Sequence, residues 1–124
     1  MCLLNEGTRG LIDAERLKLM KPTAYLLNMA RGPIVVEAAL IEALKSKRIA
    51  GAGLDVFEIE PTPTSNPLLA MDNVIATPHS LSWTDECARD IATDALTGIV
   101  ALSQGRRPVY VVNTDVLAKL KLKS

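Results

Sequence analysis

Several residue types that build common functional sites are scarce in this chain. It has two cysteines, Cys2 and Cys87, one histidine and no C-x-x-C pair. Neither a disulfide framework nor a zinc site is therefore expected. With one Trp, two Tyr and one Phe among 124 residues, the chain also lacks the aromatic side chains that form base-stacking platforms for single-stranded nucleic acid.

Charge of one sign and long apolar runs are also lacking. The formal net charge is zero, with 14 basic and 14 acidic residues, so there is no electrostatic footprint for nucleic acid or for an anionic membrane. No apolar run approaches the ~18 residues that span a bilayer. The segment Met1–Glu6 has neither the basic region nor the apolar length of a signal peptide. We therefore expect a cytoplasmic protein that binds neither nucleic acid nor membrane.

Hydrophobic patterning predicts strands that alternate with helices. Short apolar runs end at breakers, and longer segments carry their apolar residues at helical spacing. The predicted elements are a short helix capped by Asp13, a strand at 24–28, a helix at 37–46, strands at 49–57 and 74–77, and a long helix that opens at Ser82 and stops at Gly105. Such alternation predicts an α/β fold with a parallel, doubly wound sheet.

Polar residues follow the three predicted strands. Arg31 stands after the first, just before the breakers Gly32 and Pro33, an acidic segment (55–60) ends the second, and His79 follows the third. The carboxyl ends of parallel strands share one edge of the sheet, and ligands bind there. A single residue of this kind is more often a solvated surface group. Three converging on one edge favour a site.

The chemistry of this set suits the reduction of a 2-oxo acid. Arg31 could bind a carboxylate bidentately and polarise the adjacent carbonyl group. His79 could deliver a proton as hydride arrives, and a neighbouring carboxylate would favour its charged form and fix its tautomer.

The residues alone leave three choices open. Glu58 and Glu60 compete for the place beside His79, because their spacing would point them to opposite faces of a continuing strand. Asp55 lies inside the predicted strand 49–57, where aspartate is disfavoured; it could accept from a nicotinamide carboxamide or cap a helix end. Trp83 could wall the site or pack in the core.

A phosphate cradle is not evident. The chain has no G-x-G-x-x-G, and its Gly51-Ala52-Gly53 run lies within a predicted strand rather than on a strand-to-helix turn.

Four motifs, in order and spacing, resemble the D-isomer-specific 2-hydroxyacid dehydrogenases. They are Asn28-Met29-Ala30-Arg31-Gly32, Gly51-Ala52-Gly53-Leu54-Asp55-Val56-Phe57, Glu60-Pro61 and Thr77-Pro78-His79. The likeness runs from Cys2 to about Asn113. It implies the second half of a Rossmann-like NAD-binding domain at residues 1–105, followed by a tail at 106–124 that would return toward a substrate domain.

The resemblance also implies roles for particular residues. Arg31 would bind substrate, Glu60 rather than Glu58 would pair with His79, and His79 would exchange the proton. The implied cofactor is NAD, and NADP is not excluded. The residues that would contact it are Cys2, Met29, Ala30, Arg31, Asp55, His79, Ser80, Leu81 and Ser82. The implied substrate is a small 2-oxo or 2-hydroxy acid, and the implied assembly is a homodimer in a full-length context.

Departures from the family pattern temper this expectation. Met1 stands where the family usually has His, Val36 replaces a common acid, and Leu81 and Ser82 replace a glycine pair. Without the Gly-rich loop we expect a fragment whose isolated chain turns over negligibly. The alternatives are an NAD-responsive protein-binding module resembling the corepressors of this family, which the run Leu4–Glu6 and Trp83 favour, and an inactive remnant.

Overall fold

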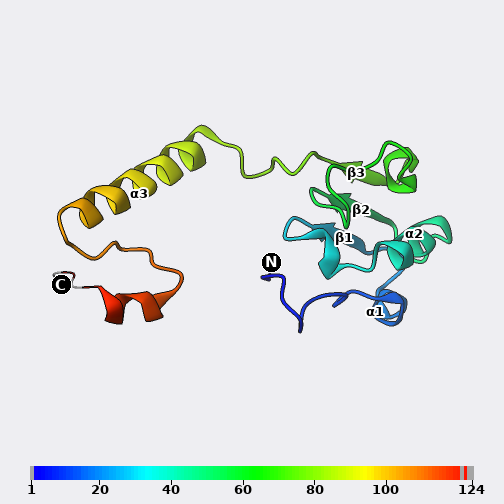
Figure 1. Ribbon diagram of the computed structural model, residues 1–124. Helices are drawn as coiled ribbons and strands as arrows, with labels where there is room; N and C mark the ends of the chain where they lie inside the picture. Colours follow the sequence, from blue (N-terminus) through cyan, green and yellow to red (C-terminus); the bar gives the residue numbers. More distant parts are fainter. Residues whose placement is uncertain (1, 121, 123–124) are drawn as a thin grey trace. The chain divides into compact units, whose positions relative to one another are not determined.

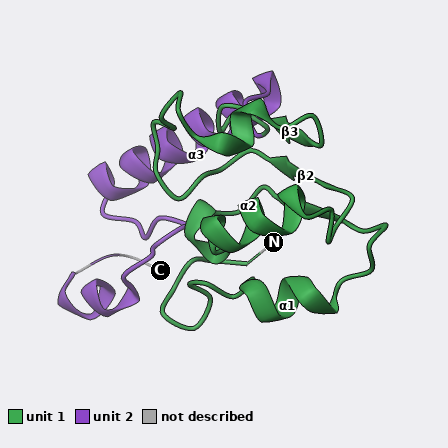
Figure 2. Ribbon diagram, turned by 90° about the vertical axis from the view of Figure 1, so that its right-hand side faces the viewer, with its two compact units in different colours: residues 1–81 green, residues 82–124 purple. Residues whose placement is uncertain are grey.

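The computed structural model describes residues 2–120 and 122. The chain forms two compact units, residues 1–81 and residues 82–124, which are coloured separately in Figure 2. The division expected from the resemblance, at residue 105, concerns the family's domain plan and stays a prediction. Met1 and three residues of the expected tail, Lys121, Lys123 and Ser124, lie outside the described residues.

The first unit contains a three-stranded parallel sheet in the order β1-β2-β3 (Figure 1). Its elements are α1 (Ala14–Leu19), β1 (Tyr25–Asn28), α2 (Glu37–Lys45), β2 (Gly51–Leu54) and β3 (Val74–Ala76), with 3-10 helices η1 (Gly32–Ile34) and η2 (Pro67–Ala70). The strands are in register with Leu26 opposite Ala52 and Ala52 opposite Val74. The predicted α/β fold with a parallel sheet is confirmed.

The core lies on one face of this sheet. Leu17 of α1 and Leu40 and Leu44 of α2 are buried in one cluster with Ala52 and Leu54 of β2. Alternate residues of a strand point to opposite faces, and on β2 the intervening residues are glycines. Helix packing therefore buries the large side chains of one face only.

On the opposite face the apolar side chains are exposed. Tyr25 and Leu27 of β1 are 68% and 65% exposed, and Ile75 of β3 is 75% exposed. Parallel sheets usually have both faces covered. The bare face is thus the main departure of this unit from a complete doubly wound sheet.

The second unit is built on α3 (Asp85–Ser103), followed by the 3-10 helix η3 (Thr114–Lys119). Thr84, not the predicted Ser82, is the N-cap, because the Thr84 hydroxyl accepts from the Cys87 amide at 3.1 Å. Gly105 ends the helix with φ 67°, as expected of a C′ glycine. Among the described residues, no helix is both long and apolar enough to cross a membrane.

The second strand is shorter than expected. Pairing ends at Leu54, so Asp55 lies at the edge of the sheet rather than inside the strand. The Asp55 amide still donates to the Asn28 carbonyl at 3.0 Å. The Asp55 side chain accepts hydrogen bonds from the chain after β3 and does not face a neighbouring strand residue. The low preference of aspartate for strands therefore does not apply at this position.

Two segments approach unusually closely where Gly32 meets the peptide bond between Phe57 and Glu58. A Cβ built on Gly32 would lie 1.9 Å from the Phe57 carbonyl oxygen and 2.5 Å from the Glu58 nitrogen. Any side chain at Gly32 would therefore overlap backbone atoms, which cannot rotate away. The turn after β1 is held directly against the chain that follows β2.

Gly32→Ala should accordingly destabilise the first unit. We expect the free energy of unfolding to fall by ~1–3 kcal/mol, the usual range for overpacking. Urea denaturation of the 124-residue chain measures it. Gly7→Ala is the control, because a Cβ at Gly7 meets its nearest neighbour, Asn5 Oδ1, at 3.4 Å. Equal stability of Gly32→Ala and the control would contradict the close approach.

Candidate active site

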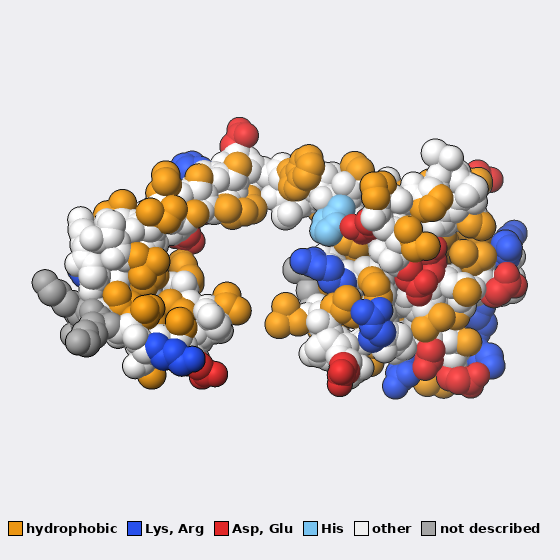
Figure 3. Space-filling model, viewed as in Figure 1, with side chains coloured by type: hydrophobic (Ala, Val, Ile, Leu, Met, Phe, Trp, Pro, Cys, Tyr) orange, Lys and Arg blue, Asp and Glu red, His pale blue; other side chains and the backbone are white. Residues whose placement is uncertain are grey.

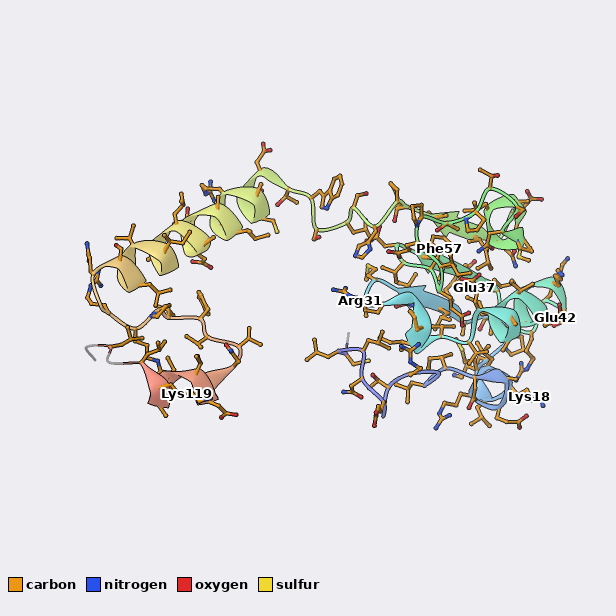
Figure 4. The ribbon with its side chains drawn as sticks, in the orientation of Figure 1. Lys18, Arg31, Glu37, Glu42, Phe57 and Lys119 are labelled. Carbon is orange, nitrogen blue, oxygen red and sulfur yellow. The ribbon has the colours of Figure 1, made fainter. Side chains whose placement is uncertain are left out.

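The polar residues that follow the three strands lie at one edge of the first unit. Arg31 follows β1, Asp55 and Glu60 follow β2, and His79 follows β3. Because the strands are parallel and adjacent, their carboxyl ends form a common rim. Arg31 is labelled in Figure 4, where it stands at the end of β1.

The turn that carries Arg31 is built by Asn28. The buried Asn28 side chain donates from Nδ2 to the Arg31 carbonyl at 3.0 Å and accepts at Oδ1 from the Ala30 amide at 3.1 Å. The Arg31 guanidinium is exposed and donates from Nη1 to the Ala30 carbonyl at 2.6 Å. One fixed contact leaves most of its five N–H groups available to a ligand.

Glu60 and His79 form a hydrogen-bonded pair. Nδ1 of His79 lies 2.9 Å from Oε2 of Glu60, and the two side chains are 44% and 37% exposed. The histidine, pale blue in Figure 3, is visible at the surface of the unit. The other carboxylate oxygen of Glu60, Oε1, accepts from the Phe57 amide at 3.0 Å. Both oxygens are thus held, and the carboxylate is oriented toward the imidazole.

Neighbouring donors change the acidity of Glu60. The hydrogen bond from His79 and then that from the Phe57 amide hold the pKa of Glu60 below its ordinary value, against the opposing effect of burial. The charge of His79 and that of Arg31 lower it further. The guanidinium therefore favours the charged form of the Glu60 carboxylate.

Glu58 has a different task. Its Oε1 accepts from the Glu37 amide at 2.9 Å, at the first residue of α2. Val36, the N-cap position of that helix, makes no side-chain capping bond. Glu58 thus supplies from a distant segment the acceptor that Val36 lacks, and it is not placed beside His79.

Asp55 anchors the segment that presents His79. Its Oδ1 accepts from the Thr77 hydroxyl at 2.6 Å and the Ser80 amide at 2.9 Å, and its Oδ2 accepts from the Leu81 amide at 3.2 Å. Burial raises the pKa of Asp55, but these three donors, together with the charge of His79, more than offset it, and the pKa falls below its ordinary value.

His79 itself has an uncommon backbone conformation. Its φ is 54°, in the left-handed region that few residues other than glycine adopt. Such a conformation persists where the surroundings impose it. Here the bonds from Thr77, Ser80 and Leu81 to Asp55 bracket His79 on both sides.

A hollow of about 640 Å³ opens beside the pair. Its size is within the range of small-molecule sites. Arg31 is not among the residues that line it, which are Asp55, Phe57, Glu60, Pro61, Thr62, Leu69, Ala76, Thr77, Pro78 and His79. Asp55, Glu60 and His79 thus share one concave surface, and Arg31 lies on the β1 side of them.

The remaining residues predicted to contact a cofactor lie at varied places. Met29 and Ala30 belong to the turn after β1, with Met29 46% exposed. Ser80 and Leu81 use their amides to bind Asp55. Cys2 is exposed near the start of the described chain.

Ser82 belongs to the second unit. Trp83 of that unit is 80% exposed rather than part of a core.

Sequence reasoning missed the residues that support the site. Glu37 accepts from the Glu58 amide at 3.1 Å and from the Asn66 side chain at 2.8 Å. Thr77 was not expected to bind Asp55. Asn28 carried a usable signal, since an Asn that ends a strand often builds the following turn with its side chain. The bonds of Glu37 and Thr77 join segments more than 20 residues apart and carry no local signal.

Comparison with known proteins extends this description. Residues 1–80 match the model of the "D-isomer specific 2-hydroxyacid dehydrogenase, NAD binding domain". A glyoxylate reductase of Thermofilum pendens is 48% identical over 92% of this chain and 34% of its own length. A glyoxylate/hydroxypyruvate reductase B of Enterobacter agglomerans is 47% identical over 92% of this chain and 35% of its own.

Solved structures show the same likeness. D-lactate dehydrogenase from Lactobacillus jensenii, with NAD+, superposes with a TM-score of 0.84 at 35% identity, covering 91% of this chain and 38% of that chain. A D-isomer specific 2-hydroxyacid dehydrogenase from Xanthobacter autotrophicus Py2, in complex with NADPH and MES, gives 0.78 at 45% identity, covering 93% and 47%.

The chain spans about a third of the length of the curated relatives that it matches. The match includes the whole rim, from Arg31 after β1 to His79 after β3. This chain therefore belongs to the D-isomer specific 2-hydroxyacid dehydrogenases, and residues 1–80 correspond to the NAD-binding domain of that family.

Proposed function

We propose that this chain carries the proton-transfer and substrate-binding groups of an NAD(P)-dependent oxidoreductase. The reaction is hydride transfer between a nicotinamide and the C2 carbon of a small 2-oxo or 2-hydroxy acid. The observation that carries the proposal is the Glu60–His79 pair, oriented at both carboxylate oxygens and exposed to a hollow at the carboxyl rim of the sheet.

Residues of the hollow fit a nicotinamide dinucleotide. The bound dinucleotide would supply or accept the hydride. Asp55 lines the hollow, and its carboxylate, with about four acceptor sites, takes three donors from the chain. It retains capacity for the N–H of a carboxamide. Met29, Ala30 and Arg31, in the turn after β1, would extend the contact.

His79 would transfer the proton through Nε2. Because Nδ1 is held by Glu60, Nε2 is the ring nitrogen that remains for a substrate oxygen. In reduction, the C2 carbonyl carbon gains a hydride and its oxygen gains the Nε2 proton, which yields the hydroxyl group. Glu60 stabilises the imidazolium before transfer and fixes the Nδ1–H tautomer after it.

Arg31 would bind the substrate carboxylate. A guanidinium offers a planar fork that matches a carboxylate with two parallel hydrogen bonds. Two observations support this role: Arg31 is exposed, and its charge contributes to the lowered pKa of Glu60. Glyoxylate and hydroxypyruvate, the substrates named for the relatives above, carry the required 2-oxo acid group.

The proposal predicts a separation of catalysis from cofactor binding. In a chimera where this chain replaces the matching third of the Thermofilum pendens glyoxylate reductase, His79→Ala should lower kcat by roughly 10²–10⁴-fold, the usual contribution of a general acid. The Kd for NADH should change by no more than about threefold. On the scale where 1.4 kcal/mol corresponds to a tenfold change, this is a small loss of binding free energy. Stopped-flow rates and NADH fluorescence titration measure the two quantities.

The exposed Glu42→Gln variant of the same chimera is the control and should leave both values unchanged. A parallel loss of kcat and NADH affinity in His79→Ala would mean that the histidine supports the structure rather than the reaction.

The carboxyl of Glu60 should titrate abnormally in the isolated chain. Its pKa should lie below 4.5, its ordinary value, and should rise toward that value in His79→Ala, because the largest cause of the shift is lost. The folded state is stabilised by this carboxylate at pH above 4.5, and that contribution disappears as the pH falls through the lowered pKa. Carboxyl 13C NMR measures the titration.

Asp13 provides the internal control for this titration. Its pKa is lowered chiefly by the Arg16 amide, which is independent of His79, so the same substitution should not move it. A Glu60 pKa that ignores the loss of His79 would contradict the pairing.

A further inference from the structure

Glu37 lies outside the hollow and connects three segments: the start of α2, the chain after β2 and the chain before η2. It is the first residue of α2, and both of its carboxylate oxygens are used. Oε2 accepts from the Glu58 amide at 3.1 Å, and Oε1 accepts from Nδ2 of Asn66 at 2.8 Å. Asn66 in turn caps η2 by accepting from the Leu68 amide at 3.0 Å.

The contact between Glu37 and Glu58 is reciprocal. Glu58 Oε1 accepts from the Glu37 amide at 2.9 Å while Glu37 Oε2 accepts from the Glu58 amide. Two hydrogen bonds therefore fasten the start of α2 to the chain after β2. The helix amino terminus favours negative charge at both carboxylates.

At the peptide bond between Phe57 and Glu58, the turn after β1 meets the chain after β2. Gly32, the neighbour of Arg31, packs directly on the peptide between Phe57 and Glu58. The amide of Phe57 donates to Glu60, and the amide of Glu58 donates to Glu37. In Figure 4 the labelled Arg31, Glu37 and Phe57 come from three separate segments of the unit.

We propose that Glu37 is a positioning residue that sets the orientation of the Glu60 carboxylate toward His79 by holding the Phe57–Glu58 peptide in place. This inference rests on the proposed function, in which Glu60 fixes the tautomer of His79. Glu37 acts through the backbone. The Glu58 amide that it holds is one residue along the chain from the Phe57 amide, which belongs to the adjoining peptide and donates to Glu60 Oε1. This bond leaves Oε2 of Glu60 for the imidazole.

The role requires a carboxylate of this length. Glutamine would offer one oxygen and set an NH2 group against either the Glu58 amide or the Asn66 amide, both of which are donors. Aspartate keeps the charge but is shorter by one methylene. The pair of substitutions therefore separates the geometry of Glu37 from its charge.

His79 is the only histidine of the chain, so its ring 15N signals give an unambiguous readout. The experiment uses the 124-residue chain in alkaline solution, where the ring is neutral and its two 15N shifts report the tautomer. The wild-type chain should favour the Nδ1–H tautomer, in which Nδ1 donates a hydrogen bond to Glu60. Glu37→Gln and Glu37→Asp should both lose this preference and move toward Nε2–H.

Two comparisons make the test specific. Glu42→Gln, on the same helix and bonded only to Lys45 among the described contacts of its carboxylate, should keep the wild-type tautomer. In a Glu60→Gln background, neither Glu37→Gln nor Glu37→Asp should have a further effect, because the action of Glu37 passes through Glu60. A through-space effect of the charge would persist for Glu37→Gln in that background and would be absent from Glu37→Asp alone.

Failures of the two proposals give different results. If the wild-type ring favours Nε2–H and Glu60→Gln changes nothing, the Glu60–His79 pairing and the proposed function with it are wrong. If Glu60→Gln abolishes the Nδ1–H preference but Glu37→Asp and Glu37→Gln retain it, only the role of Glu37 is overturned. Circular dichroism of each variant verifies that the compared chains are folded.

Discussion

Contact between Gly32 and the peptide that joins Phe57 to Glu58 is the constraint around which the site is arranged. It brings the turn after β1 against the chain after β2 with no side chain between them. Arg31 precedes this contact and Glu60 follows it by two residues. The distance between the backbone at Arg31 and the backbone that carries Glu60 is therefore set by close packing of main-chain atoms, which leaves little freedom.

Carboxylates serve as structural anchors throughout this rim. Asp55 holds the left-handed backbone at His79, Glu58 caps α2, and Glu37 fastens the peptide after β2. Each accepts backbone amides, which are strong donors whose positions the fold fixes. Hydrogen bonds to charged groups contribute about 1.5–3 kcal/mol each, enough to hold local conformations that cost a similar amount.

The arrangement joins rigid support to exposed chemistry. Asp55 and Asn28 are buried and hydrogen-bonded to the chain around them, whereas Arg31, Glu60 and His79 reach the surface. Buried polar groups fix where the exposed ones stand, and the exposed groups remain able to meet a ligand. The proposed function requires this exposure, because the three side chains must contact a bound dinucleotide and its substrate at the surface of the unit.

Much of this was determined by the sequence alone. Apolar spacing and breakers located the helices and strands of the first unit, and four motifs indicated the family and the Arg31, Glu60 and His79 set. Local patterns cannot contain the bonds between distant segments, so the sequence misplaced Asp55 within a strand, and it left Glu58 and Glu60 unresolved until the resemblance was used. The Ser82 cap was a wrong choice between two nearby hydroxyl residues, because Thr84 accepts the Cys87 amide instead. Only the tertiary structure showed Glu58 turned to α2, Glu60 turned to His79, and Glu37 and Thr77 as supports. These contacts depend on which segments the parallel sheet brings side by side, and that is a property of the packed chain and not of any stretch within it.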